Sequence, residues 1–257
     1  MYFDNIIESL KNNSSVEAIC LGGSRASGLN DEKSDYDVYV YYNKPIPLED
    51  RRNILEPNCK YMEIGVSYFE EEDDCILNNG IIIELIYRNI NEFCESVDKT
   101  LVNSSASLGY TTCFFDNIVH SRVLFDRNKS YKQMVKKIEV YPESLRQNII
   151  SKNMEMLHGV IASYDLQIIK AYQRGDFVSV NHRISAYLAS YFDIIFALNK
   201  MYHPGEKRLV EIVKKKCNLI PKDFEKNISL LLRNEDIENT LESIYNNLLL
   251  LIKEERN

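Results

Sequence analysis

The stretch Ile19–Tyr42, which reads ICLGGSRASGLNDEKSDYDVYVYY, decides how we expect this chain to fold. It starts with a short apolar run, which predicts a buried strand, and continues into Gly22, Gly23 and Ser24. Glycine has no Cβ, so this turn lets the backbone pass close to a large ligand. A helix that opens directly after the turn presents free N–H groups that favour phosphate. The stretch therefore predicts a strand, a phosphate-binding turn, a short helix and a second strand.

Two carboxylates stand at the start of the second strand. Asp35 and Asp37 come directly before an apolar, β-branched and aromatic run at 38–42. Positions i and i+2 of a strand point to the same face, and two carboxylates held side by side repel unless a cation lies between them. A glycine turn or an aspartate pair is common on its own, but unpaired buried charge is costly. The combination favours a divalent-metal site facing the turn.

Glu84 adds a third carboxylate. It is the only charged residue in the apolar run 81–87. One interpretation is a glutamate paired with a neighbouring Arg or Lys at the edge of a strand. The other is a carboxylate that an adjacent strand brings to Asp35 and Asp37. Three hard oxygen donors suit Mg²⁺, and two such ions can clamp the attacking and leaving oxygens of an in-line displacement.

The hydrophobic pattern becomes helical from about Pro142, and we place the domain boundary ahead of this change, after residue 128. Before that point, short apolar runs and turns predict a helix at 2–11, strands at 16–21 and 38–42, and a hairpin of 61–69 with 81–87 beside an acidic loop at 70–74. After it, the period predicts a long helix over 145–171 and further helices at 178–199, 206–216, 224–232 and 237–251. We therefore expect an α+β fold, with a sheet domain at 1–128 and an all-helical domain at 129–257.

Composition limits the classes of function. The chain has 257 residues and a net charge of −7, which argues against broad nucleic-acid binding, because that binding depends on a basic surface. Its six cysteines form no CxxC pair, and no signal peptide is evident, so we expect a cytoplasmic protein. The longest apolar stretch, Leu248–Ile252, is too short to span a bilayer.

At these residues the sequence resembles the DNA polymerase beta-like nucleotidyltransferase superfamily. That superfamily's pattern is hG[GS]S, a short gap, [DE]h[DE]h, and a third acid on a later strand. Ser24, Asp35, Asp37 and Glu84 match those positions. The match covers roughly the first 90 residues. The chain's size and helical second half are similar to those of small nucleotidyltransferases that act on lincosamide and aminoglycoside antibiotics.

The resemblance implies an N-terminal domain with a mixed sheet flanked by helices, which binds metal and nucleotide, followed by a helical bundle that binds the acceptor. The implied reaction transfers a nucleoside monophosphate from an NTP, with ATP expected, to a hydroxyl of a small molecule such as an antibiotic. Pyrophosphate is released, and two Mg²⁺ ions are the expected cofactors.

The resemblance also implies roles for individual residues. Gly23 and Ser24 would hold the β- and γ-phosphates, with Arg25 as a helper. Asp35 and Asp37 would hold the metal ions, and Glu84 would complete one of them.

Assignments in the helical half are less direct. A carboxylate there would act as general base, and Glu155 and Asp165 are the candidates, against the alternative that each is a solvated helix charge. Lys207 follows a Pro-Gly turn and is expected to reach the triphosphate, although an ordinary surface charge gives the same pattern. Similarly, the acidic segment 70–74 would attract a cationic acceptor or is simply solvated.

Two alternatives stay open. The acceptor is a protein or tRNA, as in toxin–antitoxin or regulatory members, although the acidic balance makes nucleic acid the weaker choice. Or the domain binds nucleotide without catalysis, which the presence of all three acids disfavours. The apolar C-terminal helix packs either within the chain or across a homodimer.

Overall fold

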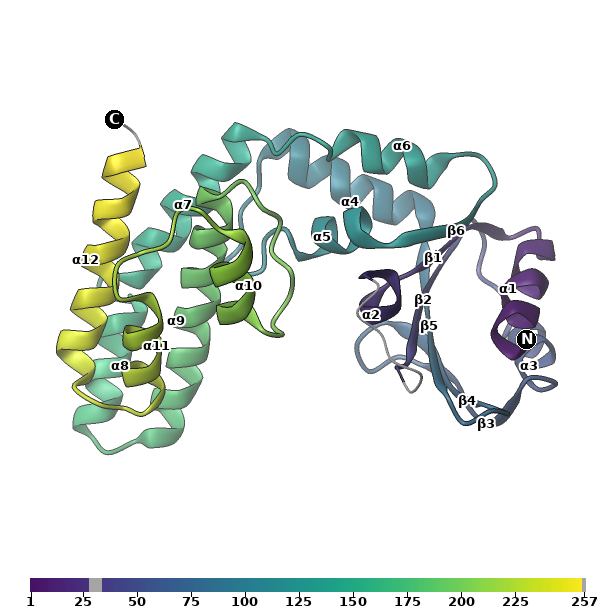
Figure 1. Ribbon diagram of the computed structural model, residues 1–257, viewed down its shortest axis with the longest axis horizontal. Helices are drawn as coiled ribbons and strands as arrows, with labels where there is room; N and C mark the ends of the chain where they lie inside the picture. Colours follow the sequence, from purple (N-terminus) through teal and green to yellow (C-terminus); the bar gives the residue numbers. More distant parts are fainter. Residues whose placement is uncertain (28–33, 256–257) are drawn as a thin grey trace. The chain divides into compact units, whose positions relative to one another are not determined.

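The computed structural model describes residues 1–27 and 34–255. Within this part of the chain there are two compact units (Figure 1): unit 1 comprises Met1–Asp98 and Asn117–Val140, and unit 2 comprises Lys99–Asp116 and Tyr141–Asn257. Helix α4 (Ile90–Asn103) contributes to both. The expected division at 128/129 into a nucleotide domain and an acceptor domain stays a prediction. No described helix is long and apolar enough to cross a membrane.

Unit 1 is built on one sheet, which has six strands in the described part of the chain, in the order β3-β4-β5-β2-β1-β6. The strands are β1 (Val16–Leu21), β2 (Tyr36–Tyr42), β3 (Cys59–Val66), β4 (Glu71–Leu77), β5 (Ile82–Asn89) and β6 (Arg122–Asp126). The neighbours β2 and β5 run parallel, and the other neighbouring pairs run antiparallel. The sheet is therefore mixed, which confirms the expected fold class.

Helices α1 (Tyr2–Asn12) and α3 (Leu48–Leu55) cover one face of this sheet, which we call the core face (Figure 1). The apolar side of α1 packs there against alternate residues of the strands, such as Val38 and Leu85. Strand β1 is buried along its whole length. We call the opposite face of the sheet the open face. Because side chains alternate along a strand, every second residue of β2 and β5 points to the open face.

Strand β4 corrects the expected topology. The segment 61–69 does not pair with 81–87, because β3 and β5 both pair with β4, which lies between them. The acidic stretch that reads as a loop therefore begins a central strand. Its Asp73 is fully buried on the core face and forms an ion pair with the equally buried Arg51 of α3, 3.1 Å away. A run of acidic residues predicts an exposed loop, because burying a carboxylate is costly without a partner. Here the partner is an arginine that is distant in the sequence.

Near β1 and β6, aromatic side chains cover the open face. Tyr41 of β2 packs against Phe93 of α4 and Tyr131 of α6 (Ser130–Lys137). Further along the same face, Asp37 and Glu84 stay partly exposed. Two of the three predicted metal ligands thus lie on a part of the open face that the described residues leave partly exposed.

Unit 2 is helical, as expected. Its helices are α7 (Glu143–Leu157), α8 (Tyr164–Gln173), α9 (Phe177–Leu198), α10 (Leu209–Lys216), α11 (Phe224–Leu232) and α12 (Ile237–Glu255). Helix α9 is the central element and contacts α7, α8 and α10. Helix α12 packs against α8 and α11 and buries its apolar stripe within the unit, while the expected homodimer stays a prediction.

The prediction of a single long helix over 145–171 is wrong, because α7 ends at Leu157 and α8 begins at Tyr164. Between them, His158 is extended and Gly159 has φ +107°, in the left-handed region that favours glycine. The apolar spacing continues across this break because both helices bury residues in the same bundle. Gly159 was the local signal for the break.

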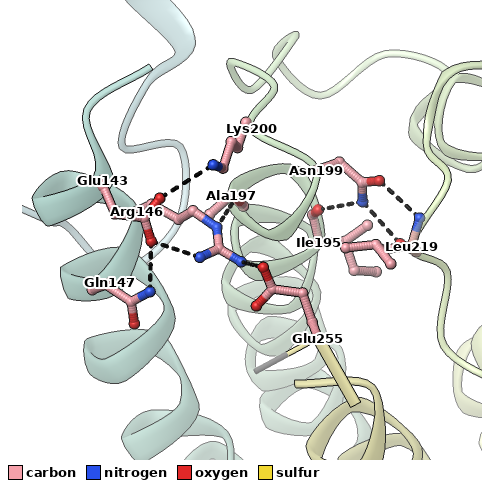
Figure 2. Close-up of polar contacts among 9 residues, drawn as sticks. All are labelled: Glu143, Arg146, Gln147, Ile195, Ala197, Asn199, Lys200, Leu219 and Glu255. Carbon is pink, nitrogen blue, oxygen red and sulfur yellow. Dashed lines mark hydrogen bonds and ion pairs between the residues drawn. The ribbon is translucent and has the colours of Figure 1, made fainter. Parts of the chain in front are cut away.

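A buried arginine joins three helices of unit 2 (Figure 2). Arg146 of α7 forms 2.7 Å ion pairs with Glu143 and with Glu255 of α12, and its Nε donates to the carbonyl of Ala197 in α9. Hydrogen bonding from Gln147 and then Arg146 lowers the pKa of Glu143 to about 2. These contacts fix the ends of α7, α9 and α12 against one another.

Candidate functional site

The glycine turn is held beside β2 by the backbone. The N–H of Gly22 donates to the carbonyl of Asp37 at 2.8 Å, and the N–H of Ala26 donates to the carbonyl of Gly22 at 3.1 Å. The second bond closes the first turn of helix α2 (Gly23–Ser27). The turn therefore starts at the end of β1 and lies alongside the first residues of β2.

Both glycines of the turn are in direct contact with β2 side chains. Gly23 has φ +60°, and a Cβ built on it would lie 1.7 Å from Oδ2 of Asp37. A Cβ on Gly22 would lie 2.6 Å from Cε2 of Tyr39. The absence of a side chain is what lets the backbone at Gly23 touch the carboxylate of Asp37.

The register of β2 and β5 brings two of the predicted ligands together. Asp37 is the direct partner of Glu84 in the parallel ladder, so the two side chains project side by side from the open face. Asp35 lies two residues earlier, just before β2, and is exposed. The ladder continues beyond Glu84 through Asp74 of β4 to Glu63 of β3. We call Asp37, Glu84, Asp74 and Glu63 the acidic row.

Within residues 1–27 and 34–255, the charged groups that act on Glu84 are carboxylates. Burial raises the pKa of Glu84, and the carboxylates of Asp37, Asp74 and Asp35 raise it further, in that order. Burial and then Glu63 likewise raise the pKa of Asp74. Among the described residues, Glu84 forms no ion pair with an Arg or Lys. The interpretation of Glu84 as one half of an edge ion pair therefore has no support here.

The acidic row could bind Mg²⁺ together with substrate phosphates. Across residues 1–27 and 34–255, no three His, Cys, Asp or Glu side chains come close enough together to hold a metal ion by themselves. Mg²⁺ commonly takes one or two carboxylates together with substrate phosphates rather than a complete protein cage. Asp37 and Glu84 supply two such oxygen donors beside the contact at Gly23. The three-ligand set that includes Asp35 stays a prediction.

Arg25 makes its described contacts with the start of β2. Its Nε donates to the carbonyls of Ser34 at 2.8 Å and Asp35 at 3.1 Å, and its guanidinium lies 3.9 Å from the ring centre of Tyr36. These contacts hold the segment that carries Asp35. The roles predicted for Arg25 and for Ser24 in phosphate binding stay predictions.

Sequence reasoning missed a group that supports the turn from the open face. The hydroxyl of Tyr39, whose ring contacts Gly22, accepts from Nδ2 of Asn117 at 2.8 Å. The guanidinium of Arg88 lies 4.5 Å from the ring centre of Tyr39 and donates two 2.7 Å hydrogen bonds to Glu70. Tyr39 could have been found from its spacing of two from Asp37, but Arg88 and Glu70 could not, because the register was unknown.

The remaining predicted residues belong to unit 2. Glu155 is exposed on α7, and Lys207 is exposed in the turn before α10, so their roles stay predictions. Asp165 is buried and bonds to Nδ1 of His158 at 2.5 Å, to the hydroxyl of Ser163, and to the N–H of Leu166. These bonds give Asp165 a structural role in the connection between α7 and α8.

Comparison with known families agrees with this geometry. Residues 4–92, which include the glycine turn, Asp37 and Glu84, match the family described as polymerase beta, nucleotidyltransferase. This part of the chain is a polymerase beta-type nucleotidyltransferase domain. Residues 113–209 match a family described only as a domain of unknown function, DUF4037. No protein of curated function matches the sequence significantly.

Solved structures with similarity to this chain include a nucleotidyltransferase-like protein from Exiguobacterium sibiricum, with 13% identity, a TM-score of 0.49, and coverage of 98% of this chain and 74% of that one. An aminoglycoside 6-adenyltransferase from Bacillus subtilis has 11% identity, a TM-score of 0.32, and coverage of 98% and 89%. A spectinomycin adenyltransferase from Enterococcus faecialis, solved with ATP and spectinomycin, has 12% identity, a TM-score of 0.30, and coverage of 96% and 96%.

Proposed function

We propose that this nucleotidyltransferase domain transfers a nucleoside monophosphate from an NTP to a hydroxyl of a small-molecule acceptor and releases pyrophosphate. The observation that carries the proposal is the pairing of Asp37 with Glu84 directly beside the backbone of Gly23. Two neighbouring carboxylates beside a close backbone approach are what a metal-bound triphosphate needs.

The turn would bind the phosphates. Because Gly23 has no Cβ, the carboxylate of Asp37 lies against the backbone of the turn, so a cation held by Asp37 would be next to a phosphate bound at the turn. Ser24 offers a hydroxyl and a backbone N–H at the start of α2, and Arg25 supplies a positive charge near the same turn. A side chain at position 23 would occupy the space that this arrangement requires.

Asp37 and Glu84 would hold Mg²⁺, with Asp35 completing the set at the start of β2. When bound, Mg²⁺ would neutralise the triphosphate and lower the pKa of the acceptor hydroxyl. The mutual repulsion of Asp37 and Glu84, which helps to raise the pKa of Glu84, favours occupation of the site by a cation. The fixed β2–β5 register keeps both carboxylates at the same level of the sheet.

The acceptor would be bound by the helical unit. In this proposal Glu155 removes the proton from the acceptor hydroxyl, and Lys207 binds the triphosphate. An antibiotic of the lincosamide or aminoglycoside class is the proposed acceptor, with ATP as the proposed donor.

The test is an acceptor panel. The purified protein is incubated with Mg²⁺, each of the four NTPs, and a series of lincosamides and aminoglycosides, and pyrophosphate release is measured. We expect release with one acceptor class, its loss in the Asp37→Asn variant, and its retention in Asp50→Asn, which changes an exposed acid on α3.

The alternatives give different results. Nucleotidylation of the protein itself or of co-purified RNA, detected by mass spectrometry, would replace the small-molecule acceptor with a macromolecule. Calorimetry that shows NTP binding unaffected by Asp37→Asn, without turnover on any acceptor, would contradict the proposed reaction and favour a non-catalytic nucleotide-binding module.

A further inference from the structure

Unit 2 contains a hollow that has no place in the proposed reaction. It has a volume of about 580 Å³ and lies between α9, α10 and α11. Ligand pockets commonly measure roughly 300–1,000 Å³, so the hollow is large enough for a small organic molecule. Its apolar lining consists of Leu188, Phe192, Leu209, Val210, Ile228 and Leu232.

The lining changes from buried to exposed between the floor and the rim. Phe192 and Ile228 are almost fully buried, at 4% and 5% exposure. Leu232, at the end of α11, is 58% exposed. An apolar ligand would displace water from these side chains, and the removal of apolar surface from water favours binding.

The mouth of the hollow carries an excess of positive charge. Its charged lining residues are Arg208, Lys214, Lys215, Glu211 and Glu225, which is one more cation than anion. Lys214 pairs with Glu225 at 2.9 Å, and Lys215 pairs with Glu211 at 2.7 Å. All four of these side chains are at least half exposed. Exposed ion pairs contribute little, so a bound anion can compete for these lysines as well as for Arg208.

We infer that this hollow binds a small apolar molecule that carries one carboxylate. The apolar part would lie against Leu188, Val210 and Leu232, and the carboxylate would lie at the mouth beside Arg208. The excess of one cation over the anions in the lining favours an anion over a cation. The inference does not depend on nucleotidyl transfer, because it uses only residues of α9, α10, α11 and the residue before α10.

The absence of tryptophan from the sequence allows a direct test. The Leu232→Trp variant of the full chain places one tryptophan at the rim, and Leu250→Trp places one on α12, where Leu250 is 56% exposed, as a matched control. Each is titrated with octanoate, octanol and octylamine while tryptophan fluorescence is recorded. We expect a saturable change with octanoate in Leu232→Trp alone, weaker binding of octanol, and the weakest binding of octylamine.

Three further substitutions in the Leu232→Trp background separate the contribution of charge from that of apolar contact. Arg208→Gln should weaken octanoate binding roughly two- to fivefold, as expected for an exposed charge pair, without changing octanol binding. Lys216→Gln, which changes an exposed lysine of α10 outside the hollow, should leave both unchanged. Val210→Glu should abolish octanoate binding.

Several results would overturn the inference. Equal binding of octylamine and octanoate, or no response to any ligand, would each contradict it. So would an identical response of Leu250→Trp. A fluorescence change that depends on protein concentration and not on ligand concentration would also contradict it. The last result would assign the hollow to contacts between copies of the chain.

Discussion

Asp73 and Asp74 are neighbours in β4, yet their carboxylates lie on opposite faces of the sheet and in opposite electrostatic environments. Asp73 points to the core face, where it is fully buried, pairs with Arg51 and accepts the N–H of Gly65 at 2.8 Å. Asp74 points to the open face, where its ladder neighbours are Glu84 and Glu63. Within one strand, the fold neutralises one carboxylate and gathers the next among like charges.

The same difference is found in the pKa shifts of these side chains. Burial raises the pKa of Asp73, but the Gly65 N–H and Arg51 oppose that rise. At Glu84 every contribution raises the pKa, because the neighbouring charged groups are all acids. Like charges placed directly opposite in a sheet are destabilising. The described carboxylates next to Glu84 lie together on the open face without the arginine that Asp73 has on the core face, which is consistent with a cation from solution binding there.

The largest effect should come from removing a carboxylate of the acidic row. On the proposed function, Asp37→Asn should lower nucleotidyl transfer about 10³-fold or more, equivalent to about 4 kcal/mol in the transition state. The same variant should unfold in urea at an equal or higher denaturant concentration, since a like charge is removed. A variant that is both inactive and clearly destabilised would place Asp37 with the structural acids of the core face.

Breaking the Arg51–Asp73 ion pair on the core face should lower stability, unlike the removal of a carboxylate from the acidic row. Arg51→Met should destabilise the protein by about 3 kcal/mol, because it leaves Asp73 buried without its cation, and urea unfolding measures this. Arg52→Met, which changes the exposed neighbour on α3, is the control and should have little effect. Adding Asp73→Asn to Arg51→Met should recover part of the loss. If the double variant is no more stable than the single one, unpaired charge is not the cause.

Asp193 of α9 tests an intermediate arrangement, a buried carboxylate with neutral donors. Its Oδ2 accepts from the hydroxyl of Thr111 at 2.7 Å, and burial raises its pKa to about 6. Since an unfolded aspartate titrates near pH ~3.9, the folded state binds more protons between about pH 4 and 6, and this contribution to stability is lost as the pH rises through that range. Asp193→Asn keeps an acceptor oxygen for Thr111 but cannot ionise, so the variant should not lose this stability as the pH rises.

The expected readout is a difference between the two proteins. Asp193→Asn should be close to wild type at pH 4 and more stable by on the order of 2 kcal/mol at pH 6.5. Burial lowers the pKa of His203 to about 4, so His203 contributes stability that is lost as the pH falls, but this contribution is common to both proteins. A difference independent of pH would show that Asp193 does not titrate in this range.

The smallest effect is expected at Glu84 without metal. Because burial and then Asp37 raise the folded pKa of Glu84, ionisation of Glu84 destabilises the folded protein as the pH rises, so Glu84→Gln should be more stable than the wild type at pH 7 in the presence of a chelator. Mg²⁺ should then stabilise the wild type more than the variant, measured by thermal unfolding. Glu95→Gln, at an exposed site on α4, should respond to Mg²⁺ as the wild type does. Equal responses of Glu84→Gln and wild type would remove Glu84 from the metal site.

The local parts of this fold could be predicted because they depend on residues close in the chain. Strand 16–21, the glycine turn and the helix at 224–232 follow from apolar spacing and from the conformational freedom of glycine. Strand β4 could not be predicted, since burying Asp73 requires Arg51, which is 22 positions away in the chain and comes from another element. The break at Gly159 was missed because the apolar period continues through it.

By itself, the sequence determined that Asp37 and Glu84 enter apolar strands and that two glycines precede a short helix, since charge and side-chain size are properties of single residues. Only the tertiary structure decided that Asp37 and Glu84 are direct neighbours and that Gly23 touches the Asp37 carboxylate. It likewise decided that Asp74 and Glu63 extend the acidic row. Strand order and register bring together residues that are distant in the chain, and no local pattern specifies them.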